Sequence, residues 1–337
     1  MANRRRLGSV TVALALLVPA LAVVMEGNGV GATELTPDRT ILVITANLRE
    51  AHPFNPDDIK PRYRDLQRLR EMRNFAQRLG NKLKRAPDVL LLQEVLEKSS
   101  RAVARALSNE FGMPFRSIVH STRFYPGRGD ANPLVVRETA IVINERSMKG
   151  TSQRGYVHTL QRKSDPPAGV RPVSKAQAYA LVRERESGAT FAAMSVHLMT
   201  RNAFASFDVA KTRRNQWTNQ LTEFMANEFP SSVPVIGGDF NETRCVEWPE
   251  RVNCALNPFW DTIANSKSYT DSVFEKNSTS DEDIASQIHK RIDFIFTGGD
   301  VEKASHDTRY DKTFGDRKFI SDHKFVRSRI AAPIISP

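Results

Sequence analysis

A carboxylate and a carboxamide stand two positions apart in the middle of the chain, directly after an apolar run. Asp239 and Asn241 follow the segment 233–238, which is mainly apolar and ends in two glycines. Side chains two positions apart project to the same side of an extended backbone, so both would face one space above the strand end. A carboxylate binds a hard cation, and an amide can hydrogen-bond a phosphate oxygen. The spacing predicts a cation and phosphate site, although a Gly-Gly-Asp turn without chemistry explains this stretch equally well on its own.

Further polar side chains stand at the ends of other apolar segments and enlarge the candidate set. Charged groups are rarely buried unless they are paired. Acids brought close together repel one another unless a divalent cation or another positive group lies among them. An oxygen-rich set favours Mg²⁺, Mn²⁺ or Ca²⁺ over zinc, and imidazoles suit proton transfer or contact with a phosphate. The members are Asn47, Glu94, His197, Asp239, Asn241, Asp293, Asp322 and His323.

The segments that must position these residues alternate irregularly between strands and helices. The spacing of apolar residues predicts helices over 62–85, 99–111 and 203–229. Strands are expected over 41–47, 89–95, 139–143, 178–183, 191–197, the central run from 233, 291–296 and 324–330, and the stretch 153–174 is expected to be irregular. This mixture predicts the α/β class with mixed sheets, in one domain from about residue 40 to about residue 330.

Five short motifs, spread over most of the chain, resemble the endonuclease/exonuclease/phosphatase superfamily. They are Leu-Leu-Gln-Glu-Val at 91–95, Ser-Val-His-Leu at 195–198, Gly-Asp-Phe-Asn at 238–241, Arg-Ile-Asp-Phe-Ile at 291–295 and Ser-Asp-His at 321–323. Each motif is weak alone, but all five occur in the family's order. The resemblance implies a deoxyribonuclease I-like fold, which is a four-layered α/β sandwich of two packed mixed β-sheets flanked by helices.

The resemblance also implies roles at a metal centre. Glu94 would bind the essential divalent metal, with Asn47 and Asp322 close to it. Asp239 and Asn241 would orient or deprotonate the attacking water and hold the phosphate. These roles match the needs of phosphodiester hydrolysis, which are in-line attack by water and neutralisation of charge on the phosphate.

Two histidines and an arginine complete the implied site. His323, steered by Asp293, would act as general acid or base or stabilise the charge of the phosphorane. His197 would contact the phosphate from the opposite side, and Arg137 would reach the substrate phosphate. The sequence does not identify the glutamate that partners the first histidine in deoxyribonuclease I; Glu138 is only the neighbour of Arg137.

The N-terminal residues predict export. Three arginines at 4–6 precede an apolar run over 10–25, and small residues end at Ala32. This order is typical of a secretory signal peptide over 1–32, with an uncleaved anchor as the alternative. In a secreted protein, Cys245 and Cys254 would form a disulfide that closes a short loop.

The chain is strongly basic, with a formal net charge of +11. Removal of residues 1–32 would leave about +9, and such a field attracts polyanions, anionic membranes or phosphorylated small molecules without choosing among them. The leading hypothesis is a secreted, divalent-metal-dependent phosphodiesterase, a nuclease acting on DNA or RNA. The alternatives are a sphingomyelinase or phosphomonoesterase acting on a phosphorylated lipid or small molecule, a toxin-type nuclease subunit and an inactive binding module.

Overall fold

The computed structural model divides the chain into two units, residues 1–34 and 35–337, and every described residue lies in the second. The predicted signal peptide, the two cysteines, Asp322 and His323 lie outside the described residues. The structure describes residues 40–48, 61–95, 99–120, 122–123, 134–170, 172–241, 269–271, 293–306 and 325–332.

Six strands form the first sheet, in the order β13-β14-β1-β2-β6-β3. The pair β1 and β2 is parallel, and its neighbours β14 and β6 are antiparallel to it, so the sheet is mixed. β1 and β2 are buried and mainly apolar, as expected of strands that are covered on both faces. The strands are β1 (Thr40–Asn47), β2 (Val89–Gln93), β3 (Phe115–Val119), β6 (Ala140–Asn144), β13 (Val301–His306) and β14 (Val326–Ala331).

The second sheet contains eight strands and is also mixed. Its order is β11-β12-β10-β9-β8-β5-β4, and β7 pairs with β8 off this path. β9 and β10 are parallel, whereas β12 and β8 run antiparallel to them. The strands are β4 (Thr122–Arg123), β5 (Leu134–Arg137), β7 (Met148–Leu160), β8 (Val173–Glu184), β9 (Thr190–His197), β10 (Val233–Asp239), β11 (Thr270–Asp271) and β12 (Asp293–Thr297).

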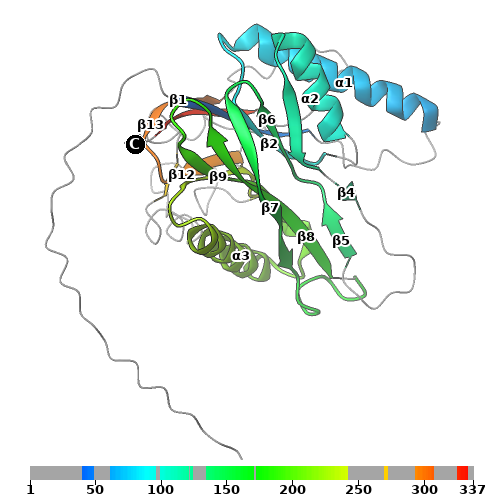
Figure 1. Cartoon of the computed structure of the whole chain (residues 1–337). Helices are drawn as coiled ribbons and strands as arrows, with labels where there is room; N and C mark the ends of the chain where they lie inside the picture. Colours follow the sequence, from blue (N-terminus) through cyan, green and yellow to red (C-terminus); the bar gives the residue numbers. More distant parts are fainter. Residues whose placement is uncertain are drawn as a thin grey trace, which may run out of the picture. The chain divides into compact units, whose positions relative to one another are not determined.

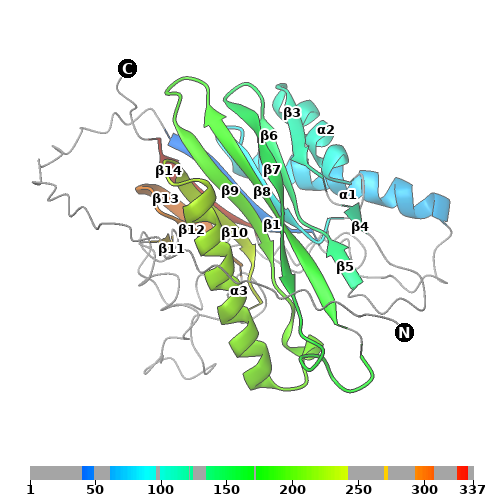
Figure 2. The same cartoon turned by 60° about the horizontal axis from the view of Figure 1, so that its bottom comes forward.

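Helices cover the outer face of each sheet (Figure 1). α1 (Pro61–Lys82) and α2 (Ser99–Phe111) pack on the first sheet through one apolar cluster that includes Leu79, Leu107 and Leu90. α3 (Phe207–Glu228) packs on the second sheet through Trp217 and Leu221. A third cluster fills the space between the sheets. Figure 2 shows the strands more nearly face-on, with α3 lying across them. The predicted four-layered sandwich is confirmed.

Some predicted element boundaries were wrong, for identifiable reasons. β7 continues to Leu160, where an irregular stretch was expected from residue 153. β7 pairs with β8 alone and exposes polar residues such as Arg154, so it lacks the apolar run of a buried strand. α3 begins at Phe207, and not at residue 203, because the Ser206 side chain accepts a hydrogen bond from the Val209 N–H and caps the helix.

Within the described part of the chain, no helix combines the length and the apolar character that a membrane crossing requires.

Candidate active site at the junction of the two sheets

The four central strands all end in, or just before, a polar candidate residue. Asn47 ends β1 and Glu94 follows β2, and these two strands are parallel neighbours in the first sheet. His197 ends β9 and Asp239 ends β10, where the two residues are aligned in the parallel ladder of the second sheet. Carboxyl ends of parallel strands gather at one edge. The structure therefore brings these four predicted residues together, and their roles stay predictions.

The four side chains are in direct contact across the two sheets. The Asn47 amide Nδ2 donates to Glu94 Oε1 and to Asp239 Oδ2, each at 3.0 Å. His197 Nε2 lies 3.6 Å from Glu94 Oε1 and 3.7 Å from Asp239 Oδ2. One ligand atom from each of Glu94, His197 and Asp239 lies within 4.8 Å of the others, which is a spacing that can hold a metal ion. Glu94 comes from one sheet and Asp239 from the other, so the site exists only where the sheets meet.

Two residues at this site adopt left-handed backbone conformations. Glu94 and Asn241 both have φ near +50°, a conformation that costs a non-glycine residue roughly 1 kcal/mol or more. Asn241 is held there by two bonds: its N–H donates to Asp239 Oδ1 at 2.8 Å, and its Nδ2 donates to the Leu198 carbonyl at 2.8 Å. Such strain, maintained by local hydrogen bonds, is typical of functional positions.

A buried polar bridge lies directly beneath the site and joins the two sheets. Gln93 Nε2 donates to Ser195 Oγ at 2.9 Å and to Thr45 Oγ1 at 3.0 Å. Ser195 Oγ in turn donates to the Leu92 carbonyl at 2.8 Å. Gln93 precedes Glu94, and Ser195 lies two residues before His197, so the bridge fixes the separation of these two site residues.

His197 is held from its other ring nitrogen by a glutamate that the sequence did not identify. Nδ1 lies 2.7 Å from Glu138 Oε1, and the Lys175 ammonium Nζ lies 2.6 Å from the same oxygen and 3.1 Å from Nδ1. Glu138 follows β5 and Lys175 lies on β8. The Glu138 main chain also accepts a hydrogen bond from the Val95 N–H at 3.0 Å, which ties it to the turn after Glu94.

These contacts set the protonation of the group. Burial acts to raise the pKa of Glu138, but the positive charges of Lys175 and His197 outweigh it and hold this pKa far below its ordinary value. Burial and the Lys175 charge lower the pKa of His197, whereas the Glu138 and Glu94 carboxylates raise it, and the net direction is upward. A protonated His197 can donate from Nε2 towards an anion in the site.

The remaining predicted residues have different positions. Asp293 begins β12 directly opposite Asp239 in the antiparallel ladder and is 1% exposed. Arg137 ends β5 with its Cζ 5.2 Å from the centre of the Tyr156 ring, so its guanidinium packs on β7, and its role in substrate binding stays a prediction. The roles given to Asp322 and His323, and the disulfide of Cys245 and Cys254, lie outside the described residues and also stay predictions.

A comparison with protein families gives this arrangement its context. The family described as "Endonuclease/Exonuclease/phosphatase family" matches residues 44–323, which is most of the chain. The chain belongs to this family. The family resemblance read from the five motifs is thereby confirmed, and membership indicates a phosphoric ester hydrolase. No curated protein matches the sequence significantly.

Solved structures of this family share the fold at low sequence identity. An endonuclease/exonuclease/phosphatase from Bacteroides vulgatus superimposes with a TM-score of 0.61 at 13% identity, over 87% of this chain and 99% of that chain. The human Nocturnin catalytic domain with a bound sulfate anion gives 0.56 at 15% identity, over 87% and 95%. A humanized D. rerio TDP2 with 14 mutations gives 0.54 at 14% identity, over 87% and 99%. At these identities the likeness shows the fold alone.

Proposed function

We propose that the protein is a divalent-metal-dependent phosphodiesterase that hydrolyses nucleic acid. The observation that carries the proposal is the convergence of Glu94, Asp239 and His197 within 4.8 Å of one another, at the end of a fold whose family acts on phosphoric esters. Asn47 contacts both carboxylates. Carboxylate, amide and imidazole groups together provide cation binding, water orientation and phosphate contact.

The donor set fits a hard divalent cation. The Glu94 and Asp239 carboxylates both accept from Asn47 Nδ2, and a divalent cation between them would offset the repulsion of their charges more fully than the single imidazole of His197. Oxygen donors with one nearby imidazole suit Mg²⁺, Mn²⁺ or Ca²⁺. Such an ion, when bound, neutralises charge on the phosphate and lowers the pKa of water. Glu94 and Asn47 would hold it, and Asp322 would join them as the family resemblance implies.

Three residues of the chain would activate the water and bind the phosphate. Asp239, buried at the end of β10, would orient the attacking water and accept its proton. Asn241, held above the strand end by its bonds to Asp239 and Leu198, would position the phosphate. His197 would donate from Nε2 to a non-bridging oxygen while Glu138 fixes its ring from Nδ1.

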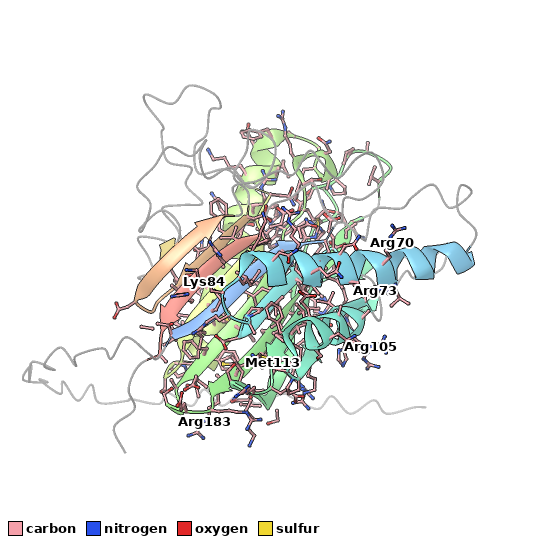
Figure 3. The ribbon with its side chains drawn as sticks, turned by 90° about the horizontal axis from the view of Figure 1, so that it is seen from above. Arg70, Arg73, Lys84, Arg105, Met113 and Arg183 are labelled. Carbon is pink, nitrogen blue, oxygen red and sulfur yellow. The ribbon has the colours of Figure 1, made fainter. Side chains whose placement is uncertain are left out.

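The choice of nucleic acid as substrate rests on charge. The formal net charge is +11, and exposed basic residues project from the helices that cover the first sheet: Arg70 and Arg73 on α1 and Arg105 on α2 (Figure 3). A polyanion interacts with many such charges at once, whereas a small phosphorylated molecule interacts with few.

A panel of substrates tests the proposal. The purified protein would be incubated with plasmid DNA, RNA, sphingomyelin and inositol phosphates, each with Mg²⁺, Mn²⁺ or Ca²⁺ and with a chelator. Cleavage of plasmid or RNA that stops with the chelator supports the proposal, and Glu94→Gln should abolish it. Release of phosphocholine from sphingomyelin without nucleic acid cleavage would assign the lipid alternative instead.

Secretion is part of the proposal and has its own test. It is supported by the charged, apolar and small-residue order of residues 1–32. N-terminal sequencing of the protein recovered from its natural host should begin at Thr33, directly after Ala32. An intact N-terminus on protein that stays inside the cell would overturn it.

A further inference from the structure

The side-chain amide of Gln177 binds both main-chain polar groups of His197. Gln177 Oε1 accepts a hydrogen bond from the His197 N–H at 2.7 Å, and Gln177 Nε2 donates to the His197 carbonyl at 3.1 Å. The antiparallel pairing of β8 with β9 ends at Ala178 opposite Ser195. Beyond that point a side chain of β8 takes the place that a main-chain partner would have. Gln177 is completely buried.

Gln177 is itself held by two buried threonines. Its Nε2 also donates to Thr159 Oγ1 at 3.1 Å, and Thr159 Oγ1 donates to the Lys175 carbonyl at 3.1 Å. Thr139 Oγ1 donates to the Ala176 carbonyl and accepts from the Ala178 N–H, both at 2.9 Å. It is therefore hydrogen-bonded to the main chain on each side of Gln177. Thr139 follows Glu138 in the chain.

These hydrogen bonds connect the main chain next to Glu138 with the main chain of His197, the two residues that meet at Nδ1 of the imidazole. Thr139, next to Glu138, fixes the β8 main chain, and Gln177 on that segment fixes the His197 main chain. We propose that Gln177 is a positioning residue that sets the His197 ring against Glu138 on one side and against Glu94 and Asp239 on the other. The consequence for catalysis rests on the proposed function. Groups that orient a site residue typically affect rate by about 10- to 100-fold.

Gln177→Leu is the direct test, and Gln161→Leu is its matched control. Gln161 is also buried and also binds main chain through both ends of its amide, accepting from the Val173 N–H at 3.0 Å and donating to the Ala203 carbonyl at 2.7 Å. Its partners are not site residues. Both variants should lose similar stability. On a phosphodiester substrate, Q177L should lower kcat about 10- to 100-fold with KM changed less than about threefold, and Q161L should change neither. Equal losses of kcat in the two variants would overturn the proposal.

A double-mutant cycle shows whether Gln177 acts through His197. In a His197→Ala background, Q177L should lower the remaining kcat by less than about twofold, because the ring that it positions is gone. A further loss as large as that of Q177L alone would mean that Gln177 acts elsewhere. Thr159→Val serves if Q177L does not fold: it removes only the hydroxyl that accepts from Gln177 and should lower kcat in the same direction by a smaller factor.

Nuclear magnetic resonance separates failure of this inference from failure of the proposed function. Ring ¹⁵N and ¹H shifts of His197, assigned by comparison with H197A, should move in Q177L and stay in place in Q161L. If the wild-type protein cleaves no phosphoric ester, the proposed function is wrong, but the change in the His197 resonances of Q177L can still be measured. Unmoved His197 resonances in folded Q177L, or in T159V in its place, would overturn the positioning role.

Discussion

His197 lies among charged side chains that affect its protonation in opposite directions. The Lys175 ammonium and the Glu138 carboxylate both lie at Nδ1, and the Glu94 carboxylate lies at Nε2. His197 is 4% exposed, so these charges are only weakly screened by water. Removing any one of these charges should therefore shift the pKa of the His197 imidazole.

Replacing Glu138 with glutamine tests how much the charge of its carboxylate contributes to the stability of the folded protein. E138Q leaves the Lys175 ammonium, whose side chain is 14% exposed, beside an uncharged amide. Breaking a buried pair in this way costs roughly 3 kcal/mol. Chemical denaturation at neutral pH, with a chelator present, should show a free energy of unfolding lower by about that amount. A loss below about 0.5 kcal/mol would mean that the pair behaves like a surface ion pair.

The same pair predicts how stability depends on pH. The folded-state pKa of Glu138 lies below its ordinary value, so ionisation of Glu138 stabilises the folded protein. This contribution is complete above the ordinary value of 4.5 and is lost as the pH falls from 4.5 towards the lower folded-state value. The difference in unfolding free energy between wild type and E138Q should narrow below pH 4.5. A constant difference down to about pH 3 would contradict the assignment.

Glu94→Gln tests how the Glu94 carboxylate affects the free energy of unfolding, first without a divalent cation and then with one. With a chelator present, E94Q should differ from wild type by less than about 1 kcal/mol, because the lost repulsion from Asp239 is offset by the lost attraction to His197. Saturating Mg²⁺ should stabilise wild type by about 3 kcal/mol at roughly one hundred times its dissociation constant, and E94Q should lose most of this gain. Thermal unfolding with and without Mg²⁺ measures both. Equal stabilisation of the two proteins would place the cation elsewhere.

Some site residues could be read from the sequence and others could not. Asn47, Glu94, His197 and Asp239 each follow an apolar run, and a polar residue at a strand end is a local signal. Gln177 carries no such signal, because its importance depends on where the pairing of β8 with β9 stops. That point is decided by contacts between segments far apart in the chain.

At the scale of elements, β10 and β9 approach each other closely at one glycine. Gly238 has φ of +154°, and a Cβ built on it would overlap the carbonyl oxygen of Val196, the residue before His197. The glycine is therefore required for the ladder that aligns Asp239 with His197.

Gly238→Ala should disrupt this ladder, and Gly112→Ala is the control. G238A combines backbone strain with overlap of main-chain atoms and should cost about 3 kcal/mol or more. Gly112 has φ of +63° but no atom within 4 Å of the added Cβ, so G112A should cost only about 1 kcal/mol. Urea unfolding of the two variants measures the difference. Equal costs would show that β9 moves aside without penalty.

The elements themselves were predicted best where their pattern was strong. The helix predicted over 99–111 coincides with α2, and the strand predicted over 191–197 matches β9 closely. The strand predicted over 178–183 covers only the second half of β8. β3, β7 and β13 were missed, as were the short strands β4, β5 and β11. β7 pairs only with β8 among the described strands and exposes several polar side chains. Its sequence therefore resembles that of a loop, even though its main chain is hydrogen-bonded to β8.

At the scale of the whole molecule, the positive charge predicts a strong salt dependence on polymeric substrates. Raising salt from about 50 to about 200 mM should lower kcat/KM for plasmid cleavage by roughly tenfold or more, because bound counterions are released when a polyanion binds. Hydrolysis of a small phosphodiester such as bis(p-nitrophenyl) phosphate should change by less than about twofold. Steady-state rates on both substrates, at constant divalent ion, make the comparison. Parallel losses on the two substrates would show that salt acts on the site itself.

The position of the site between two sheets has a consequence for partial unfolding. Each sheet keeps its own hydrogen bonds, yet neither holds enough of the site to work alone: Asn47 and Glu94 belong to one sheet, and His197 and Asp239 to the other. A compact intermediate that retains native strands but lets the layers slide, as molten globules do, would keep its far-ultraviolet circular dichroism and have no activity. On gentle heating or mild acidification, inactivation should therefore precede the loss of secondary structure, which makes enzymatic rate a sensitive reporter of tertiary order in this protein.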